Sequence, residues 1–327
     1  AFIGGIFQIW IGKMLKPIRH MFPPLVTGIV VLMIGISLLK VGFKYAGGGV
    51  WLMNNKPEIF GNWEHLTIAG TVLIVALLTN LRGKGMVSAA SILIGIIAGF
   101  IVAAMLGEVR WGKIAAADWF AFPMPLQYGI DFVWGAVILM LFMSIVTTIE
   151  TIGDISATTM GGANREATNK ELSGGIMADG VGTAFASIFN AMPNTSYSQN
   201  AGLVAFTGVI SRHVGTVAGV ILILLGLFPK LGGIIAAMPD SVIGGAAIIM
   251  FGLIAGAGIK LISKSEMSQR NILILALSLS FGIGLYAFPE FVAHIPDFGI
   301  KLKLLLTTGL IPAGMLAFIL NAILPKK

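Results

Sequence analysis

The sequence predicts an all-α polytopic membrane protein, and three observations lead to this fold class. Hydrophobic residues make up 57% of the 327 residues, and the mean hydropathy is +0.95. Charged residues account for only 11%, against about a quarter in soluble domains. The apolar stretches are hydrophobic on all sides, whereas a transmembrane β-barrel alternates apolar and polar residues. Helices are therefore expected, because a helix satisfies its own backbone hydrogen bonds inside hydrocarbon.

The same figures exclude several classes of protein. A soluble globular enzyme, a disordered chain and a disulfide-rich secreted domain all have a different composition. The sequence contains no cysteine, which excludes thiolate metal sites and cysteine nucleophiles. The net charge of +7 does not by itself indicate nucleic acid, because the basic residues of a membrane protein mainly set its orientation.

The membrane spans are predicted by length, since a helix needs about 20 apolar residues to cross a bilayer. Residues 1–10 are expected to be the end of a helix whose start is missing, and residues 175–192 to form a weaker, glycine-rich span. The distribution of basic residues favours one more crossing between residues 192 and 211. This segment is short and polar, which predicts an extended stretch plus a half-helix of the kind that usually carries a transporter's substrate site. The strongest spans are residues 25–41, 66–81, 87–106, 132–149, 214–228, 242–259, 271–287 and 304–324.

One short pattern occurs twice. Pro-x-x-Val-x-Gly begins at Pro23 and again at Pro239, 216 residues later, and both copies lead to a glycine at the same offset, Gly42 and Gly258. Proline suits the first turn of a helix, where its missing N–H costs nothing. In a membrane protein such a repeated pattern indicates a structural repeat, which is how many secondary transporters are built.

Three polar features lie where lipid is expected. Glu150 ends a long apolar run, Asp179 lies in the glycine-rich segment, and the amide pair Gln199 and Asn200 ends a polar run. A charge at the centre of a bilayer costs about 2.5–3.5 kcal/mol, so such residues indicate a cavity, a partner or a proton path. A desolvated carboxyl group also favours its neutral form, which lets it exchange a proton as proton coupling requires.

Structural roles stay open for these residues. Glu150 is also compatible with a solvated helix end, and Asp179 with an acceptor that ties glycine-rich helices together. Asn200, and less readily Gln199, is compatible with a cap at the start of a helix. Asp154 follows Glu150 by one turn and is expected to face the cytoplasmic mouth. One of these two carboxylates should have a partner or a proton, because ionised carboxylates at this spacing repel.

Three motifs in order resemble the nucleobase–ascorbate transporter family, also called the nucleobase–cation symporters. Residues 199–212 match every fixed position of its signature, which reads Gln/Glu/Pro-Asn-x-Gly, four residues, Thr, three residues, a small or polar residue and Arg. Residues 150–154 (Glu-Thr-Ile-Gly-Asp) are similar to its Glu-x-x-Gly-Asp/His motif, and residues 178–180 (Ala-Asp-Gly) to its next motif. Residues 22–24 (Phe-Pro-Pro) and 47–49 (three glycines) look like the purine-transporting bacterial members. The resemblance covers essentially the whole chain.

The resemblance implies two inverted repeats of seven membrane segments each, folded into a core and a gate domain, and a homodimer in the cell inner membrane. On that pattern the first three to four segments are missing. Residues 1–15 are then the remnant of a core-domain helix. Residues 22–127 and 236–327 are gate-domain helices of the first and second repeat. Residues 128–235 are core-domain helices of the second repeat and include a broken strand and half-helix at 193–212.

The resemblance also implies which residues bind substrate. Glu150 is expected to be the main ligand and to accept hydrogen bonds from ring N–H groups. Gln199 is expected to make a second, bidentate contact, since a carboxamide offers both a donor and an acceptor to an oxidised purine. Ser198 and Asn200 are expected to tune affinity and selectivity.

Coupling and gating roles follow in the same way. Asp179, together with Glu150, is expected to couple transport to protons. Asp154, Thr207 and Arg212 are expected to act in gating or structure. The proton is the co-transported ion, and no cofactor, metal or nucleic-acid partner is expected.

The function that the sequence indicates is proton-coupled uptake of a purine nucleobase, xanthine or uric acid, across the cytoplasmic membrane. A uracil-type nucleobase carrier is an alternative, although such carriers tend to have Glu where this chain has Gln199. An anion channel or exchanger on the same fold is another, and the acidic Glu150 and Asp179 argue against it. A membrane-embedded enzyme is a third, but the spans contain no metal-ligand spacing, Ser-x-x-Lys or His–Glu pair that would support it.

Overall fold

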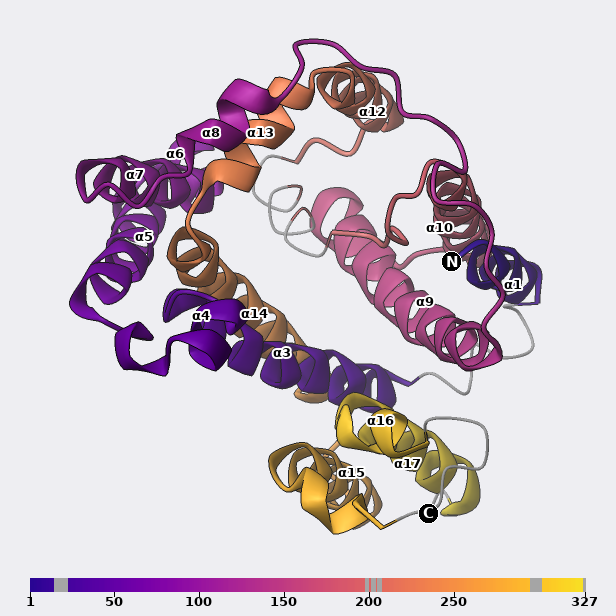
Figure 1. Cartoon of the computed structure of the whole chain (residues 1–327). Coiled ribbons are helices and arrows are strands. Elements are labelled where there is room, and N and C mark those ends of the chain that lie inside the picture. Colours follow the sequence, from indigo (N-terminus) through magenta and orange to yellow (C-terminus); the bar gives the residue numbers. More distant parts are fainter. Residues whose placement is uncertain (15–22, 198–199, 201–203, 205–207, 295–301, 326–327) are drawn as a thin grey trace. The chain divides into compact units, whose positions relative to one another are not determined.

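The computed structural model describes the chain except for residues 15–22, 198–199, 201–203, 205–207, 295–301 and 326–327. Within the described residues the regular secondary structure is helical, as the sequence predicts (Figure 1). These residues contain no strand, and that includes the described part of 193–212, where the family resemblance implies a broken strand. The α-helices are α1 (Phe2–Lys13), α3 (Pro24–Ala46), α4 (Val50–Asn55), α5 (Trp63–Arg82), α6 (Met86–Ala89), α7 (Ser91–Met105), α8 (Trp111–Ala116), α9 (Trp134–Ala163), α10 (Asn169–Ile188), α12 (Arg212–Gly226), α13 (Pro229–Ala237), α14 (Asp240–Ile262), α15 (Gln269–Ala287), α16 (Leu302–Thr307) and α17 (Leu310–Ile323), with the short 3-10 helices η2 (Pro57–Ile59) and η3 (Pro289–Val292).

Among the described residues, five helices are long and apolar enough to cross a membrane: α3, α5, α9, α14 and α15. They confirm the spans predicted at residues 25–41, 66–81, 132–149, 242–259 and 271–287. The chain is thus a multi-pass membrane protein. The sidedness expected from its basic residues stays a prediction.

Two predicted spans are shorter as helices than the hydropathy suggests, and a third ends at a sharp bend. Residues 87–106 are divided between α6 and the 15-residue α7, which meet at Ala90. In residues 304–324, Gly309 with a φ of 70° precedes the 14-residue α17. Residues 214–228 end where α12 gives way to α13, which bends by 80° and begins at Pro229. Each break lies at a turn, glycine or proline that an average over apolar residues does not detect.

The described chain divides into two compact units. The first comprises residues 1–37, 124–210 and 254–327, and the second comprises residues 38–123 and 211–253. The helices α3 and α14 are each divided between the two units, after residues 37 and 253. The division into core and gate domains at the boundaries given above stays a prediction.

In the first unit, α1 packs along α9 and α10 through glycines (Figure 1). A Cβ atom built on Gly5 would lie 2.6 Å from the carbonyl oxygen of Gly180, and one on Gly180 would lie 2.6 Å from that of Gly5. Ser144 of α9 adds a hydrogen bond of 3.0 Å to the carbonyl oxygen of Gly4. Small residues at membrane helix interfaces let backbones approach closely, and here they set the spacing of the three helices that carry the site.

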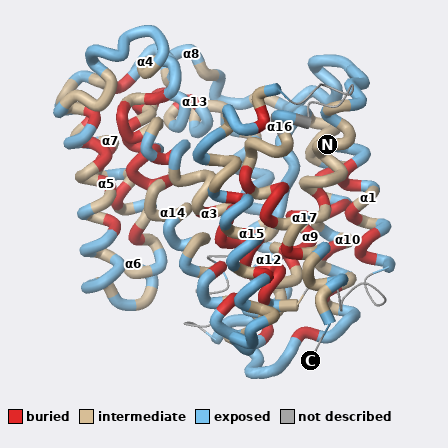
Figure 2. Tube along the Cα trace, turned by 90° about the horizontal axis from the view of Figure 1, so that it is seen from below, coloured by how far each residue is buried: buried red, intermediate tan, exposed pale blue. Residues whose placement is uncertain are grey.

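In the second unit, α5 and α7 lie side by side and bury apolar residues between them (Figures 1 and 2). Ile68 and Val72 of α5 are fully buried together with Val242 of α14. The outer surfaces of the same helices are apolar too, with Leu81 70% and Ile101 55% exposed. A soluble helix would carry polar residues there, so these surfaces fit contact with lipid.

Candidate functional site

The helix α9 carries two of the predicted site residues one turn apart. Glu150 and Asp154 are both half-buried, and Thr151 between them is only 2% exposed. The helix ends at Asn164, whose φ of 51° is left-handed, a conformation that asparagine tolerates better than most residues. The carboxylates therefore lie in the second half of a long apolar helix.

The segment that follows Pro193 contacts both carboxylates of α9. Thr195 donates its hydroxyl hydrogen to Glu150 Oε2 at 3.4 Å, and Ser196 donates to Asp154 Oδ2 at 2.5 Å. Described residues 191–197 belong to no helix or strand. This segment is where the sequence predicts an interruption, and its hydroxyl groups face the carboxylates rather than lipid.

The helix α10 closes the arrangement from another side. Thr151 of α9 donates a hydrogen bond to Asp179 Oδ2. One turn later, Thr183 donates to Asn194, at 2.9 Å from its Oδ1 and 3.1 Å from its carbonyl oxygen. Gly182 leaves room for this contact, because a Cβ atom there would lie 2.6 Å from Asn194 Nδ2. The segment after Pro193 is thus fixed between α9 and α10.

The start of α10 is fixed outside the apolar part of the chain. Thr168 and Glu171 form a capping box, in which each side chain bonds the other's backbone N–H. Arg165 donates to both carboxylate oxygens of Glu171, at 2.9 and 2.5 Å. The bonds from Arg165, and then those from Thr168, hold the pKa of Glu171 well below its usual value. This cap orients the helix that carries Asp179.

Three carboxylates therefore share one region of the first unit. The charges of Asp154 and Asp179 both act on Glu150. Within the described part of the chain, neither Glu150 nor Asp179 forms an ion pair. Nor do any His, Cys, Asp or Glu residues there form a group that could hold a metal ion. The arrangement offers a set of hydrogen-bond acceptors with negative charge, suited to a ligand rich in N–H groups and to a proton.

The remaining predicted site residues have different positions. Ser198, Gln199 and Thr207 lie outside the described residues. Asn200 is exposed, and its backbone N–H donates to the carbonyl oxygen of Tyr197 at 3.0 Å. Arg212 is exposed at the first residue of α12, in the second unit.

Several polar residues of the site were not among those predicted. They are the hydroxyl and amide partners of the carboxylates and of the interrupted segment: Thr151, Thr183, Asn194, Thr195 and Ser196. The last three belong to the polar run after Pro193, which signalled the segment but not its partners. Thr151 and Thr183 have no signal in the sequence, since threonine is ordinary in such helices.

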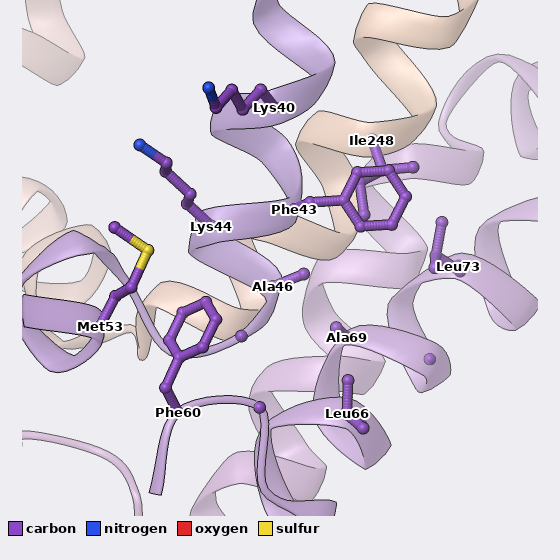
Figure 3. Close-up of a pocket in the computed structure, with 13 residues that line it drawn as sticks. Lys40, Phe43, Lys44, Ala46, Met53, Phe60, Leu66, Ala69, Leu73 and Ile248 are labelled. Atoms are coloured by element: carbon purple, nitrogen blue, oxygen red, sulfur yellow. The ribbon is translucent and has the colours of Figure 1, made fainter. Parts of the chain in front are cut away.

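A cavity of about 630 Å³ lies in the second unit (Figure 3). Its walls are apolar, with Phe43, Phe60 and Leu73 among them, and its charged groups are Lys40 and Lys44 of α3. No carboxylate lines it. It therefore lacks the acceptors that the sequence predicts for the substrate, and we place the candidate site at the carboxylates of the first unit.

A multi-pass helical protein with carboxylates gathered beside an interrupted segment has the features of a membrane permease. A family model described as "Permease family" matches residues 1–291, and the chain belongs to this family, the nucleobase–ascorbate transporters.

Three relatives of this family are similar in sequence to almost the whole chain. Xanthine permease XanP of Escherichia coli (strain K12) is 36% identical over 326 residues, which cover 98% of this chain and 69% of XanP. Xanthine permease XanQ of the same strain is 35% identical over 328 residues, covering 99% of this chain and 69% of XanQ. Uric acid permease PucJ of Bacillus subtilis (strain 168) is 34% identical over 320 residues, covering 97% of this chain and 70% of PucJ. These names support a transporter rather than an enzyme.

Proposed function

We propose that the protein is a secondary active transporter that takes up a purine nucleobase, xanthine or uric acid, together with a proton. The observation that carries the proposal is a set of three carboxylates with hydroxyl partners: Glu150 and Asp154 accept from Thr195 and Ser196, and Asp179 accepts from Thr151 between them. Relatives named as xanthine and uric acid permeases support the substrate class.

In this proposal Glu150 accepts hydrogen bonds from the ring N–H groups of the base. Its one side-chain donor among the described residues is Thr195, at the long distance of 3.4 Å, so a ligand donor can compete for the carboxylate. Gln199 supplies the second, bidentate contact through its donor and acceptor. Ser198 and Asn200 adjust the fit of the base. The purine is then read by groups on α9 and on the interrupted segment.

The proton enters through the same carboxylates. Like charges repel, so a cluster of three carboxylates with two members outside any described ion pair favours uptake of a proton. Asp179 is assigned this role together with Glu150, because Thr151 connects it directly to the substrate helix. Asp154, Thr207 and Arg212 complete the gating or structural set. No cofactor takes part, and the transporter works as a homodimer in the bacterial inner membrane.

The test is uptake of labelled xanthine and urate by cells that express the protein, with and without a protonophore. Glu150→Gln should abolish most uptake, because the amide cannot act as a double acceptor for ring N–H groups. Gln199→Glu should change the preference among oxidised bases. The matched control is Glu266→Gln, which changes an exposed glutamate outside the site.

The outcomes separate the proposal from its alternatives. Full uptake by Glu150→Gln would show that Glu150 does not bind the substrate. Uptake unaffected by the protonophore would show that transport is not coupled to protons. Preference for uracil would favour the pyrimidine carrier. Flux of chloride or sulfate without purine uptake would favour the anion exchanger.

A further inference from the structure

A small cavity that five polar residues help to line lies between α1, α9, α10 and the interrupted segment, near the carboxylate cluster. It has a volume of about 20 Å³. Its polar lining comes from four segments of the first unit: Gln8, Ser144, Thr147, Thr183 and Asn194. Thr147 precedes Glu150 by three residues on α9, and Thr183 follows Asp179 by four on α10, so the cavity lies about one turn from both carboxylates.

Gln8 is the unexplained group at this cavity. Its side chain is 2% exposed, and within the described chain its Nε2 has no hydrogen-bond partner. A buried donor left without a partner costs about 1–3 kcal/mol. No hydrogen bond joins Gln8 Nε2 to the neighbouring hydroxyl of Ser144, whose one hydrogen lies within reach of the carbonyl oxygens of Met140, at 2.8 Å, and Gly4, at 3.0 Å.

The size of the cavity decides what can fill it. A cavity needs a volume of about 10–15 Å³ to hold one water molecule, and the water needs two to four polar partners. A volume of about 20 Å³ admits one water and excludes a purine ring. Thr147, Thr183 and Asn194 line the same space as Gln8. The hydroxyl groups of Thr147 and Thr183 donate to Ser144 and Asn194, so their oxygens are the acceptors that a water can use.

We propose that this cavity binds one structural water, that Gln8 donates to this water, and that the water holds Asn194 in place. Asn194 directly precedes the two residues that bond Glu150 and Asp154. Gln8 is therefore a positioning residue for the segment 194–196, acting through Asn194. Its effect on transport rests on the proposed function, whereas the water itself does not.

The direct test is a high-resolution structure of the purified protein. Density for a water within hydrogen-bond distance of the Gln8 amide nitrogen and of Asn194 is expected. Absence of that density, at a resolution that shows other buried waters, would overturn the proposal.

The second test compares Gln8→Met, which keeps the volume but removes the donor, with Ser278→Ala. Ser278 is the matched control because it is fully buried on α15 in the same unit and its hydroxyl also has no partner in the described chain. For Gln8→Met we expect KM for uptake to rise about tenfold, the loss of one net hydrogen bond, with little change in maximal rate. Ser278→Ala should leave KM unchanged.

Thermal unfolding keeps the test independent of transport. If Gln8 were a donor without a water, replacing it by an apolar side chain of equal size would raise Tm. We expect Gln8→Met to leave Tm unchanged or lower it. A rise in Tm, or an unchanged KM, contradicts the proposal. If the unaltered protein transports no purine, the proposed function fails, while the density and Tm still decide on the water.

Discussion

Replacing Thr151 by valine tests whether the bond between α9 and α10 matters for transport. Thr151 is 2% exposed, and its hydroxyl donates to Asp179 Oδ2. Valine has nearly the same shape, so the substitution removes the donor and keeps the packing. What is lost is one hydrogen bond to the carboxylate proposed to take up the proton.

The magnitude follows from the nature of that bond. A hydrogen bond to a charged group contributes about 1.5–3 kcal/mol. Since about 1.4 kcal/mol corresponds to a factor of ten, the step that requires ionised Asp179 should slow about 10- to 150-fold. Thr151→Ser keeps a hydroxyl at the same position and should retain most of the activity.

The assay is the initial rate of labelled xanthine uptake, normalised to the amount of protein in the membrane. Thr148→Val is the matched control, because Thr148 is fully buried on the same helix and, within the described chain, its hydroxyl donates to the carbonyl oxygen of Ser144, at 2.7 Å, and to no carboxylate. It should transport nearly as well as the unaltered protein. Equal rates for Thr151→Val and Thr148→Val would refute the reasoning, since the contact with Asp179 would then be irrelevant to coupling.

Two further predictions concern the packing and the cap around the site. Gly5→Val should lower Tm strongly, because overpacking a tight contact costs about 1–3 kcal/mol or more. Gly174→Ala on α10 should leave Tm nearly unchanged, because the added Cβ would meet nothing within 4 Å. Thermal unfolding of both variants tests this difference. Glu171→Gln should lower Tm at neutral pH. Arg165 holds the pKa of Glu171 below the ordinary 4.5, so the stability that ionised Glu171 contributes is present above pH 4.5 and is lost as the pH falls below it. The Tm values of Glu171→Gln and of the unaltered protein should therefore converge in acid. A difference in Tm that persists in acid would contradict the assignment of this stability to ionised Glu171.

Much of the fold could be predicted because the bilayer imposes a simple length rule. Apolar runs of the required length predicted α3, α5, α9, α14 and α15. The same rule overestimated residues 87–106 and 304–324, where a turn and Gly309 divide the helices. Hydropathy averages over a window and carries no information about such local backbone geometry.

The carboxylates of the site could also be predicted, but their partners could not. Glu150 and Asp179 are conspicuous because charge is costly within an apolar run. Thr151 and Gln8 are single polar residues of kinds that helices often contain, and their importance depends on which helix lies opposite. That information is tertiary: the α1–α10 contact brings together segments about 170 residues apart, and no periodicity within either segment records it.

The short pattern repeated at Pro23 and Pro239 has a physical counterpart in how α3 and α14 pack. The two helices lie side by side (Figure 1), with glycines of each against the backbone of the other. Their contacts form pairs that a shift of 216 residues exchanges: Gly28 with Ile262 and Gly244 with Ala46, then Gly42 with Ile248 and Gly258 with Leu32.

Each of these contacts lies within one unit, and its shifted counterpart lies within the other. Contacts that a single shift exchanges are what an inverted repeat would produce between its equivalent helices. Selection for close packing alone would need small residues somewhere on each helix, but not at matching offsets. The glycines of the repeated sequence pattern are therefore the residues at which the two helices approach each other. The inverted repeat of the whole chain stays a prediction.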